Sequence, residues 1–244
     1  MTNVYQNRTR RINFLLFGFL LLASVAYGQR YTHFTLWSRV QVKKEFNDRW
    51  DVFGEFHYRR QSNYHHGRYN LLDSPFLNAV RLVGSYHTGA WTFQLNPSFF
   101  YSHSLLGREE DFNVPAGGEW RFAAYAEWEC AWNRLTLRLR PGYEYRLLER
   151  NGYVPTGRAR FRVQGRYAVG ERAEWVLSTE PMLNVGPNAV PVPFNQNQAY
   201  TGLDLDLLDW LGLEVGYLYV FRQRRTVVEF DNEHALNVQV KIQM

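Results

Sequence analysis

The sequence is nearly free of cysteine, because Cys130 is the only one in 244 residues. A single thiol cannot form an intrachain disulfide, and no histidine or cysteine follows it at metal-ligand spacing. We therefore expect no metal site and no cofactor. Cys130 shares the apolar positions of its segment, which predicts a small side chain on the apolar face of a strand.

Long apolar runs are missing beyond the first 28 residues. No later segment holds about 18 uninterrupted apolar residues, the length that predicts a membrane-spanning helix. The mean hydropathy of -0.42, taken alone, would indicate a water-soluble protein. Neither the search for apolar runs nor the mean hydropathy detects a membrane β-barrel, because each of its strands presents an apolar side chain only at every second position.

The N-terminus has the pattern of a secretory signal. Three arginines between positions 8 and 11 precede a mostly apolar run over 12–25, and the small residues of Ala26-Tyr27-Gly28 follow it. That order is typical of a signal peptide, and the apolar run is short for a membrane-anchoring helix. We predict a cleaved signal peptide over 1–28 and one outer-membrane β-barrel domain over 29–244.

The chain is basic, with a net charge of +5 and a pI near 9.3. Nucleic-acid binding would require a basic patch together with a recognition helix or an RNA-binding motif. Here the arginines alternate with apolar residues inside predicted strands, as in the segment 158–169. We therefore expect no nucleic-acid partner.

Period-two alternation is the strongest pattern in the chain. In the segment 135–147 the odd positions carry Leu135, Leu137, Leu139, Pro141, Tyr143, Tyr145 and Leu147, against Thr136, Arg138, Arg140, Gly142, Glu144 and Arg146. Such runs extend over about ten to twelve residues, roughly twice the usual strand of a soluble protein. The pattern predicts strands near 32–44, 50–61, 76–88, 90–104, 119–131, 135–147, 158–169, 173–184, 198–208, 211–222 and 236–244.

Short turns alternate with longer connections between these strands, as in outer-membrane barrels. Five tryptophans, at intervals of 41, 41, 43 and 35 residues, lie at or beside the short turns: Trp50, Trp91, Trp132, Trp175 and Trp210. An amphipathic ring repeated at one end of every hairpin is typical of the belt where a membrane meets water. We predict an antiparallel β-barrel of about ten to twelve strands in the outer membrane of a Gram-negative bacterium, in contact with its lipids.

The strand number stays open at ten, eleven or twelve. Eleven segments alternate, whereas single-chain bacterial barrels have even numbers of strands. Eleven would also start the first strand at the end of the long loops. Either the segment 31–44 is not a regular barrel strand, or one strand is hidden or miscounted.

Two other β architectures compete with this prediction. A period near 41 residues resembles that of β-propellers, but a propeller blade has four short strands where this chain has two long ones. A soluble β-sandwich or lipocalin-like barrel would bury the apolar face and leave the arginines in water. The long strands and the aromatic residues at their ends favour the membrane barrel.

The chain resembles a known family at several places: the signal ending Ala26-Tyr27-Gly28-Gln29, the opening Phe34-Thr35-Leu36-Trp37 that leads to a charged turn and Trp50, and Asn232-Glu233-His234 before the last strand. It is similar there to the DUF2490 family of uncharacterised outer-membrane proteins, common in Bacteroidetes. The resemblance covers about residues 30–244 and implies an outer-membrane β-barrel. It implies no established activity and no catalytic residue.

The polar faces of the strands are expected to line the barrel interior. The candidate lumen-lining residues are Arg138, Arg140, Glu144, Arg146, Arg158, Arg160, Arg162, Arg166, Glu174, Glu180, Asp204, Asp206 and Glu214. Arginine binds carboxylates with two parallel hydrogen bonds, so crossing ion pairs can fill a narrow lumen as a polar plug. Alternatively, arginine-rich rings select anions, and the interior forms a narrow pathway for a small anionic solute. The leading prediction is a structural or transport-type barrel without enzymatic activity.

A lipid-active enzyme at the membrane edge is the alternative. Ser85 and His87 share one face, and Ser102-His103-Ser104 lies near a loop, but neither set contains an identifiable nucleophile, base and orienting group. His65-His66 could bind a metal ion, yet adjacent side chains diverge and no further ligands follow. We therefore predict no catalytic and no metal-binding residues.

Overall fold

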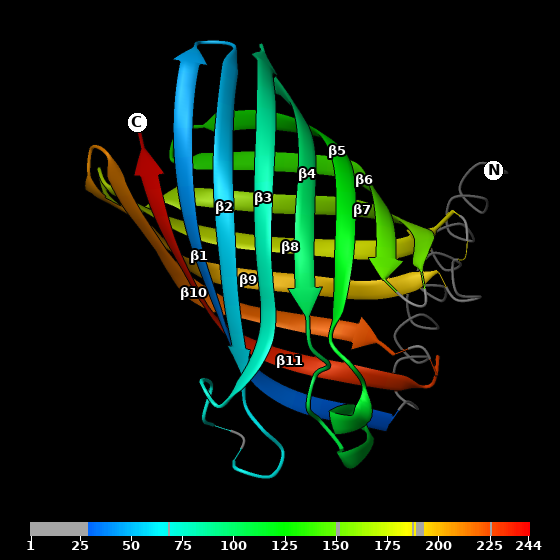
Figure 1. Cartoon of the computed structure of the whole chain (residues 1–244). Coiled ribbons are helices and arrows are strands. Elements are labelled where there is room, and N and C mark those ends of the chain that lie inside the picture. Colours follow the sequence, from blue (N-terminus) through cyan, green and yellow to red (C-terminus); the bar gives the residue numbers. More distant parts are fainter. Residues whose placement is uncertain (1–28, 68, 150–151, 187, 189–192, 225) are drawn as a thin grey trace, which may run out of the picture.

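Eleven strands close into one barrel (Figure 1). The computed structural model describes residues 29–67, 69–149, 152–186, 188, 193–224 and 226–244, so the signal peptide predicted over 1–28 lies outside the described residues. Within them, no helix is long and apolar enough to cross a membrane. The predicted all-β closed barrel is confirmed.

The strands follow one another around the barrel in chain order. Their bounds are β1 (Gln29–Asn47), β2 (Trp50–Gln61), β3 (Ser74–Thr88), β4 (Trp91–Ser102), β5 (Gly117–Trp132), β6 (Leu135–Glu149), β7 (Tyr153–Ala168), β8 (Ala173–Val185), β9 (Phe194–Leu208), β10 (Leu211–Gln223) and β11 (Glu229–Gln243). One short 3-10 helix, η2 (Glu109–Asn113), lies between β4 and β5.

The barrel closes through a parallel pair. Consecutive strands are antiparallel, whereas β1 and β11 run in the same direction with Thr35 opposite Ala235. Parallel closure is a geometric necessity, because the first and last of an odd number of alternating strands point the same way. The structure thus resolves the strand number at eleven, and the segment 31–44 is part of a regular strand.

The two ends of the barrel differ. At the short-turn end, strands are joined by tight turns such as 89–90 and 133–134, and the backbone N–H of Met244 donates to Lys43. The long-loop end carries the connections after β2 and β4 and the first residue of β1. The long connection predicted between the sixth and seventh strands is wrong, because β6 and β7 stay paired as far as Glu149 and Tyr153. At this connection the alternation of polar and apolar residues stops earlier along the strands than the backbone pairing between β6 and β7.

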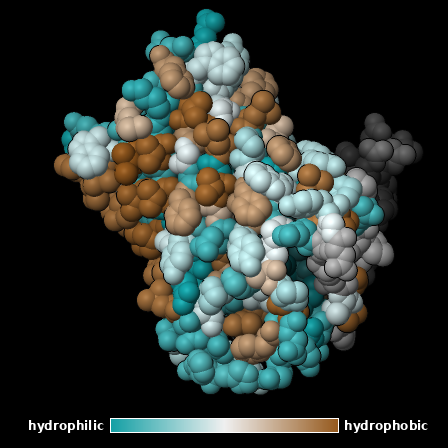
Figure 2. Space-filling view, in the orientation of Figure 1, coloured by the Kyte–Doolittle hydropathy of each residue, from teal (hydrophilic) through white to brown (hydrophobic). Residues whose placement is uncertain are grey.

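The predicted assignment of faces holds along the barrel wall. Arg158 is 5% exposed, whereas Phe161 of the same strand is 43% exposed. Large apolar side chains cover the outside of the strands, and Figure 2 shows them as brown patches above a teal loop end. The five spaced tryptophans are all exposed, between 44% and 75%. Soluble monomers rarely expose contiguous apolar surface of this kind.

A smaller apolar cluster lies inside the barrel. It includes Trp37, Phe76, Phe100 and Leu105, which approach the long-loop end of the interior. Leu218 and Val220 belong to the same core, at successive inward-facing positions of β10 where strict alternation would place polar residues. The alternation of β10 is interrupted because part of the lumen is packed with apolar side chains.

Candidate functional site: the lumenal cavity

The interior encloses a cavity of about 1040 Å³ to which all eleven strands contribute. Its wall extends from Arg108 near the long-loop end to Lys241 near the short-turn end. Fifteen basic and nine acidic side chains line it. Four further carboxylates pair with lining bases from beside the wall, which leaves a formal excess of two positive charges: Glu129, Glu174, Asp204 and Glu233. The lumen is therefore polar, ionic and cationic on balance.

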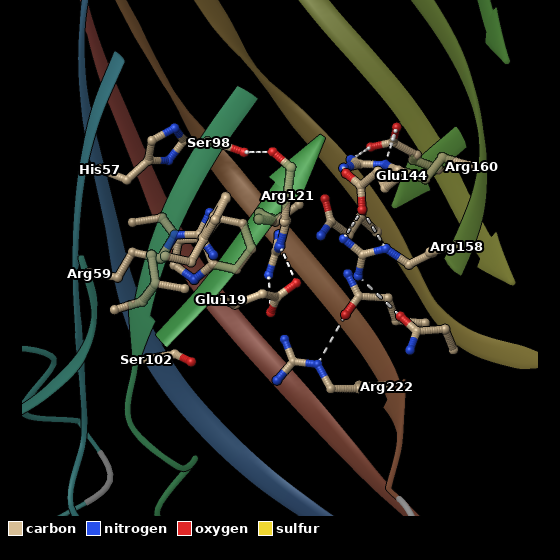
Figure 3. A pocket seen from close by; sticks show the side chains of 18 of the residues that line it. His57, Arg59, Ser98, Ser102, Glu119, Arg121, Glu144, Arg158, Arg160 and Arg222 are labelled. Atoms are coloured by element: carbon tan, nitrogen blue, oxygen red, sulfur yellow. Dashed lines mark hydrogen bonds and ion pairs between the residues drawn. The ribbon is translucent and has the colours of Figure 1, made fainter. Parts of the chain in front are cut away.

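Glu144 of β6 holds the centre of the arginine-rich wall. The strand register sets it opposite Arg158, which donates to it from two nitrogens, while Arg160 donates at 2.5 Å and the Tyr125 hydroxyl at 2.9 Å. The carboxylate is 3% exposed. Figure 3 shows Glu144, Arg158 and Arg160 gathered on one side of the cavity. A buried carboxylate with this many donors fixes two guanidinium groups in place.

Two further carboxylates bridge arginines on neighbouring strands. Glu119 accepts from Arg121, at 2.6 Å, and from Arg146, at 2.5 Å. Each arginine donates to both carboxylate oxygens of Glu119. Glu180 accepts from Arg160 at 2.6 Å. Each acid on this wall serves more than one base, which leaves the cations in excess.

Closer to the short-turn end, a second ionic layer surrounds Asp204. This carboxylate accepts from Arg166 and, at 2.6 Å, from Lys241. Lys241 also donates to Glu214 at 2.8 Å, and Arg166 to Glu174 at 2.6 Å. This second layer links side chains of five consecutive strands, β7 to β11.

At the long-loop end, the connection between β4 and β5 folds against the closing strands. We refer to residues 103–116 as the mouth loop. Within it, Arg108 donates to Glu229 at 2.6 Å, and Asp111 accepts from Arg224 at 2.9 Å. A hydrogen bond from Arg108 to the Tyr31 hydroxyl raises the pKa of that guanidinium above its ordinary value. The mouth loop is thus tied to both sides of the β1–β11 seam.

The close approach of the mouth loop depends on a glycine. A Cβ placed on Gly107 would lie 2.3 Å from Cε1 of His33, a buried residue of β1. His33 is fixed by its 2.8 Å contact with Asp231 across the seam. Any larger side chain at position 107 would push the mouth loop away from the barrel rim.

A family model described as "Protein of unknown function (DUF2490)" matches residues 34–231. The chain belongs to this family. A solved structure titled "NanC porin structure in rhombohedral crystal form" is similar to the DUF2490 chain, with 12% sequence identity and a TM-score of 0.47. That similarity covers 78% of this chain and 86% of the porin chain. No curated protein matches the chain in sequence.

Most of the predicted lumen residues of this DUF2490 chain border the cavity. Those that do are Arg138, Arg140, Glu144, Arg146, Arg158, Arg160, Arg162, Arg166, Glu180 and Glu214. Glu174 and Asp204 bind Arg166 from beside the cavity wall. Asp206 is exposed near the short-turn end and makes no ion pair with any described residue.

Several functional side chains were not singled out from the sequence. Glu119 and Tyr125 share the inward parity of Arg121, so alternation alone could have found them. Arg108 and Arg224 lie outside the strands, where no periodicity applies. Their role depends on where the mouth loop folds, which no local pattern shows.

The candidates Ser85 and His87 do not form a nucleophile and base. His87 contacts Asp51 at 2.8 Å through Nε2 and Thr92 at 3.0 Å through Nδ1, so neither nitrogen remains for Ser85. Ser85 itself is 2% exposed inside the barrel, where a lipid substrate at the outer rim cannot reach it.

The two loop histidines also separate. His65 lies 3.0 Å from Glu109, and His66 lies 3.3 Å from Asp73. Across the described residues, no group of three histidine, cysteine or acidic side chains is arranged to hold a metal ion.

Proposed function

We propose that this chain is an outer-membrane β-barrel that lets small anions pass through its arginine-rich lumen. Membrane insertion is supported by the outward apolar face and by the exposed tryptophans at one end of the barrel. The signal sequence expected over 1–28 would direct the chain out of the cytoplasm.

The cationic cavity is the observation that carries this proposal. Its volume of about 1040 Å³ is at the upper end of pockets that hold small molecules, roughly 300–1,000 Å³. Once the partner carboxylates behind the wall are counted, positive charge is still in excess by two. Rings of arginine attract anions and exclude cations from a pore, because the field of a narrow cavity is little screened by water.

The ion pairs favour a lined pathway over a filled plug. Arg158 and Arg160 of β7 bind carboxylates of the two adjacent strands. Their side chains therefore lie along the wall and do not fill the cavity. Pairing also holds the guanidinium groups in fixed positions. A permanent cationic lining results.

The test is electrical. Purified protein reconstituted in a planar bilayer under a KCl gradient should conduct, with a reversal potential of the sign that chloride permeation gives. The control is Arg172→Gln, at an exposed short-turn residue that pairs with Asp209 outside the cavity, and it should leave the selectivity unchanged. Absence of conductance at every salt concentration, or selectivity for potassium, would refute an anion pathway.

A further inference from the structure

Two neighbouring arginines of the cavity wall have no carboxylate partner. Arg59 of β2 makes no hydrogen bond and no ion pair with any described residue, and its buried Nε has no acceptor. Arg39 of β1 makes one hydrogen bond, at 3.5 Å, to the Asn237 amide oxygen, and its Nε is also unsatisfied. Both line the cavity, as do the arginines of the opposite wall, but those are paired with carboxylates.

The strand register sets these two cations close together. Arg39 lies opposite His57 and Trp37 lies opposite Arg59, so the two arginines are diagonal neighbours on the inward face. Such positions are about 7–8 Å apart at the backbone, within reach of long side chains. Figure 3 shows Arg59, Arg121 and Arg222 around the same part of the cavity. Arg121 is paired with Glu119 and Arg222 with Glu233, so the positive charge without an ion pair at this level belongs to Arg39 and Arg59.

The nearby carboxylates are already occupied. Glu233 accepts from Thr35, Trp37 and Arg222, and its side chain is fully buried. Thr35 and Trp37 share one of its oxygens and Arg222 takes the other, and no hydrogen bond or ion pair joins Glu233 to Arg59.

The acids nearest to Arg39 are engaged as well. Glu55 contacts Arg81 at 2.9 Å and His57 at 3.0 Å, and Glu214 contacts Lys241 at 2.8 Å. The protein thus leaves two neighbouring, half-buried arginines without a direct ion pair and with an unsatisfied buried Nε each, an arrangement that is costly unless another anion is present.

The Arg59 guanidinium is also held in a fixed orientation. It stacks on the indole of Trp37, with its central carbon 3.3 Å from the ring centroid. Trp37 is itself anchored, because its Nε1 donates to Glu233 at 2.6 Å. A guanidinium over the face of a ring keeps its N–H donors in its own plane above the ring, where they are free to bind a ligand from the side.

We propose that Arg39 and Arg59 together bind one small oxyanion, a carboxylate or a phosphate group, inside the lumen. The two forks supply donors in the geometry that such oxygens accept bidentately, and Trp37 positions one of them. This inference builds on the proposed function, since it names the solute class and the place where the solute pauses.

Calorimetric titration of the detergent-solubilised protein at low ionic strength tests the site. Inorganic phosphate and acetate serve as the two probes, in separate titrations that distinguish recognition of a phosphate from recognition of a carboxylate. The wild type should bind at least one of them saturably, with one site per barrel. Arg59→Gln and Arg39→Gln should each weaken binding about ten- to hundredfold, the effect of losing a charged hydrogen bond.

Two variants control for folding and for nonspecific charge. Arg138→Gln removes a cavity arginine that is paired with Glu129, and it should change the affinity less than about twofold. Arg59→Lys retains the charge but not the planar fork, and it should bind with intermediate affinity. No binding by the wild type, or an equal loss in Arg138→Gln, would overturn the proposed site.

Bilayer recordings separate this site from the pathway. Binding that depends on Arg59, in a barrel that does not conduct, would keep the site and reject the passage of anions. Anion-selective conductance that phosphate blocks equally in the wild type and in Arg59→Gln would keep the pathway and reject the site.

Discussion

Buried carboxylates decide where the lumenal arginines lie. Glu144 joins donors from β5 and β7 at one point of the wall, so its negative charge is shared by two guanidinium groups and a phenol. Without it, like charges on adjacent inward positions of β7 would repel each other in a space with little water.

Replacing this acid should therefore destabilise the barrel. Glu144→Gln is expected to lower the free energy of unfolding by about 3 kcal/mol, the low end for breaking a buried ion pair, because Arg160 retains Glu180. Urea unfolding of the reconstituted protein, followed by tryptophan fluorescence, measures the change. Glu171→Gln, in an exposed turn, should change it by less than about 0.5 kcal/mol. Equal stability of the two variants would argue against a wall built on Glu144.

At the residue scale, alternation predicts which side chains face inward but not their partners. The inward positions of Arg158 and Glu144 follow from period two within each strand. That they meet, while Arg59 meets no acid, depends on the register between strands and on barrel closure. Neither is encoded in any single segment.

Among the elements, the mouth loop contributes most to the shape of the long-loop end. Its two arginine contacts, Arg108 with Glu229 and Arg224 with Asp111, connect β4 and β5 to the closing strands. The run Glu109-Glu110-Asp111 is acidic, and taken alone it would indicate a solvated stretch. Asp111 is instead 7% exposed, because it caps η2 and binds Arg224.

Cutting this connection should loosen the mouth loop. Arg224→Gln removes donors to Asp111 and Asp231, and amide hydrogen exchange over 107–113 should accelerate about tenfold or more. Asp111→Asn should have a similar effect, and the double variant should add little, since both changes break one interaction. Exchange no faster than in Arg172→Gln would show that other contacts hold the mouth loop.

For the molecule as a whole, the outward apolar face predicts contact with acyl chains. In a Cys130→Ser background, which removes the exposed native thiol, a probe on Leu137→Cys should be quenched by lipid-soluble nitroxides. The adjacent Arg138→Cys should react with water-soluble thiol reagents instead, because it faces the cavity. A reversed labelling pattern would mean that the barrel does not reside in a bilayer with this face outward.

Strand segments and their faces could be predicted from the sequence because membrane-type strands alternate over ten or more residues. The closure of the barrel by parallel pairing of β1 with β11 could not be predicted from the sequence. The first strand, β1, alternates as the others do, so its pattern does not show whether its partner runs parallel or antiparallel. The general preference for even strand numbers pointed away from the observed eleven.

The parallel seam has a consequence for how the barrel assembles. Hydrogen bonds such as Thr35 to Glu233 join residues 198 positions apart, far beyond the separation within any hairpin. Pairing between such distant segments costs more loop-closure entropy than pairing within a hairpin. The hairpins therefore form first, and β1 pairs with β11 last. Until then, β1 and β11 present unpaired edges, and the rate at which those edges find each other sets the kinetics of the final folding step.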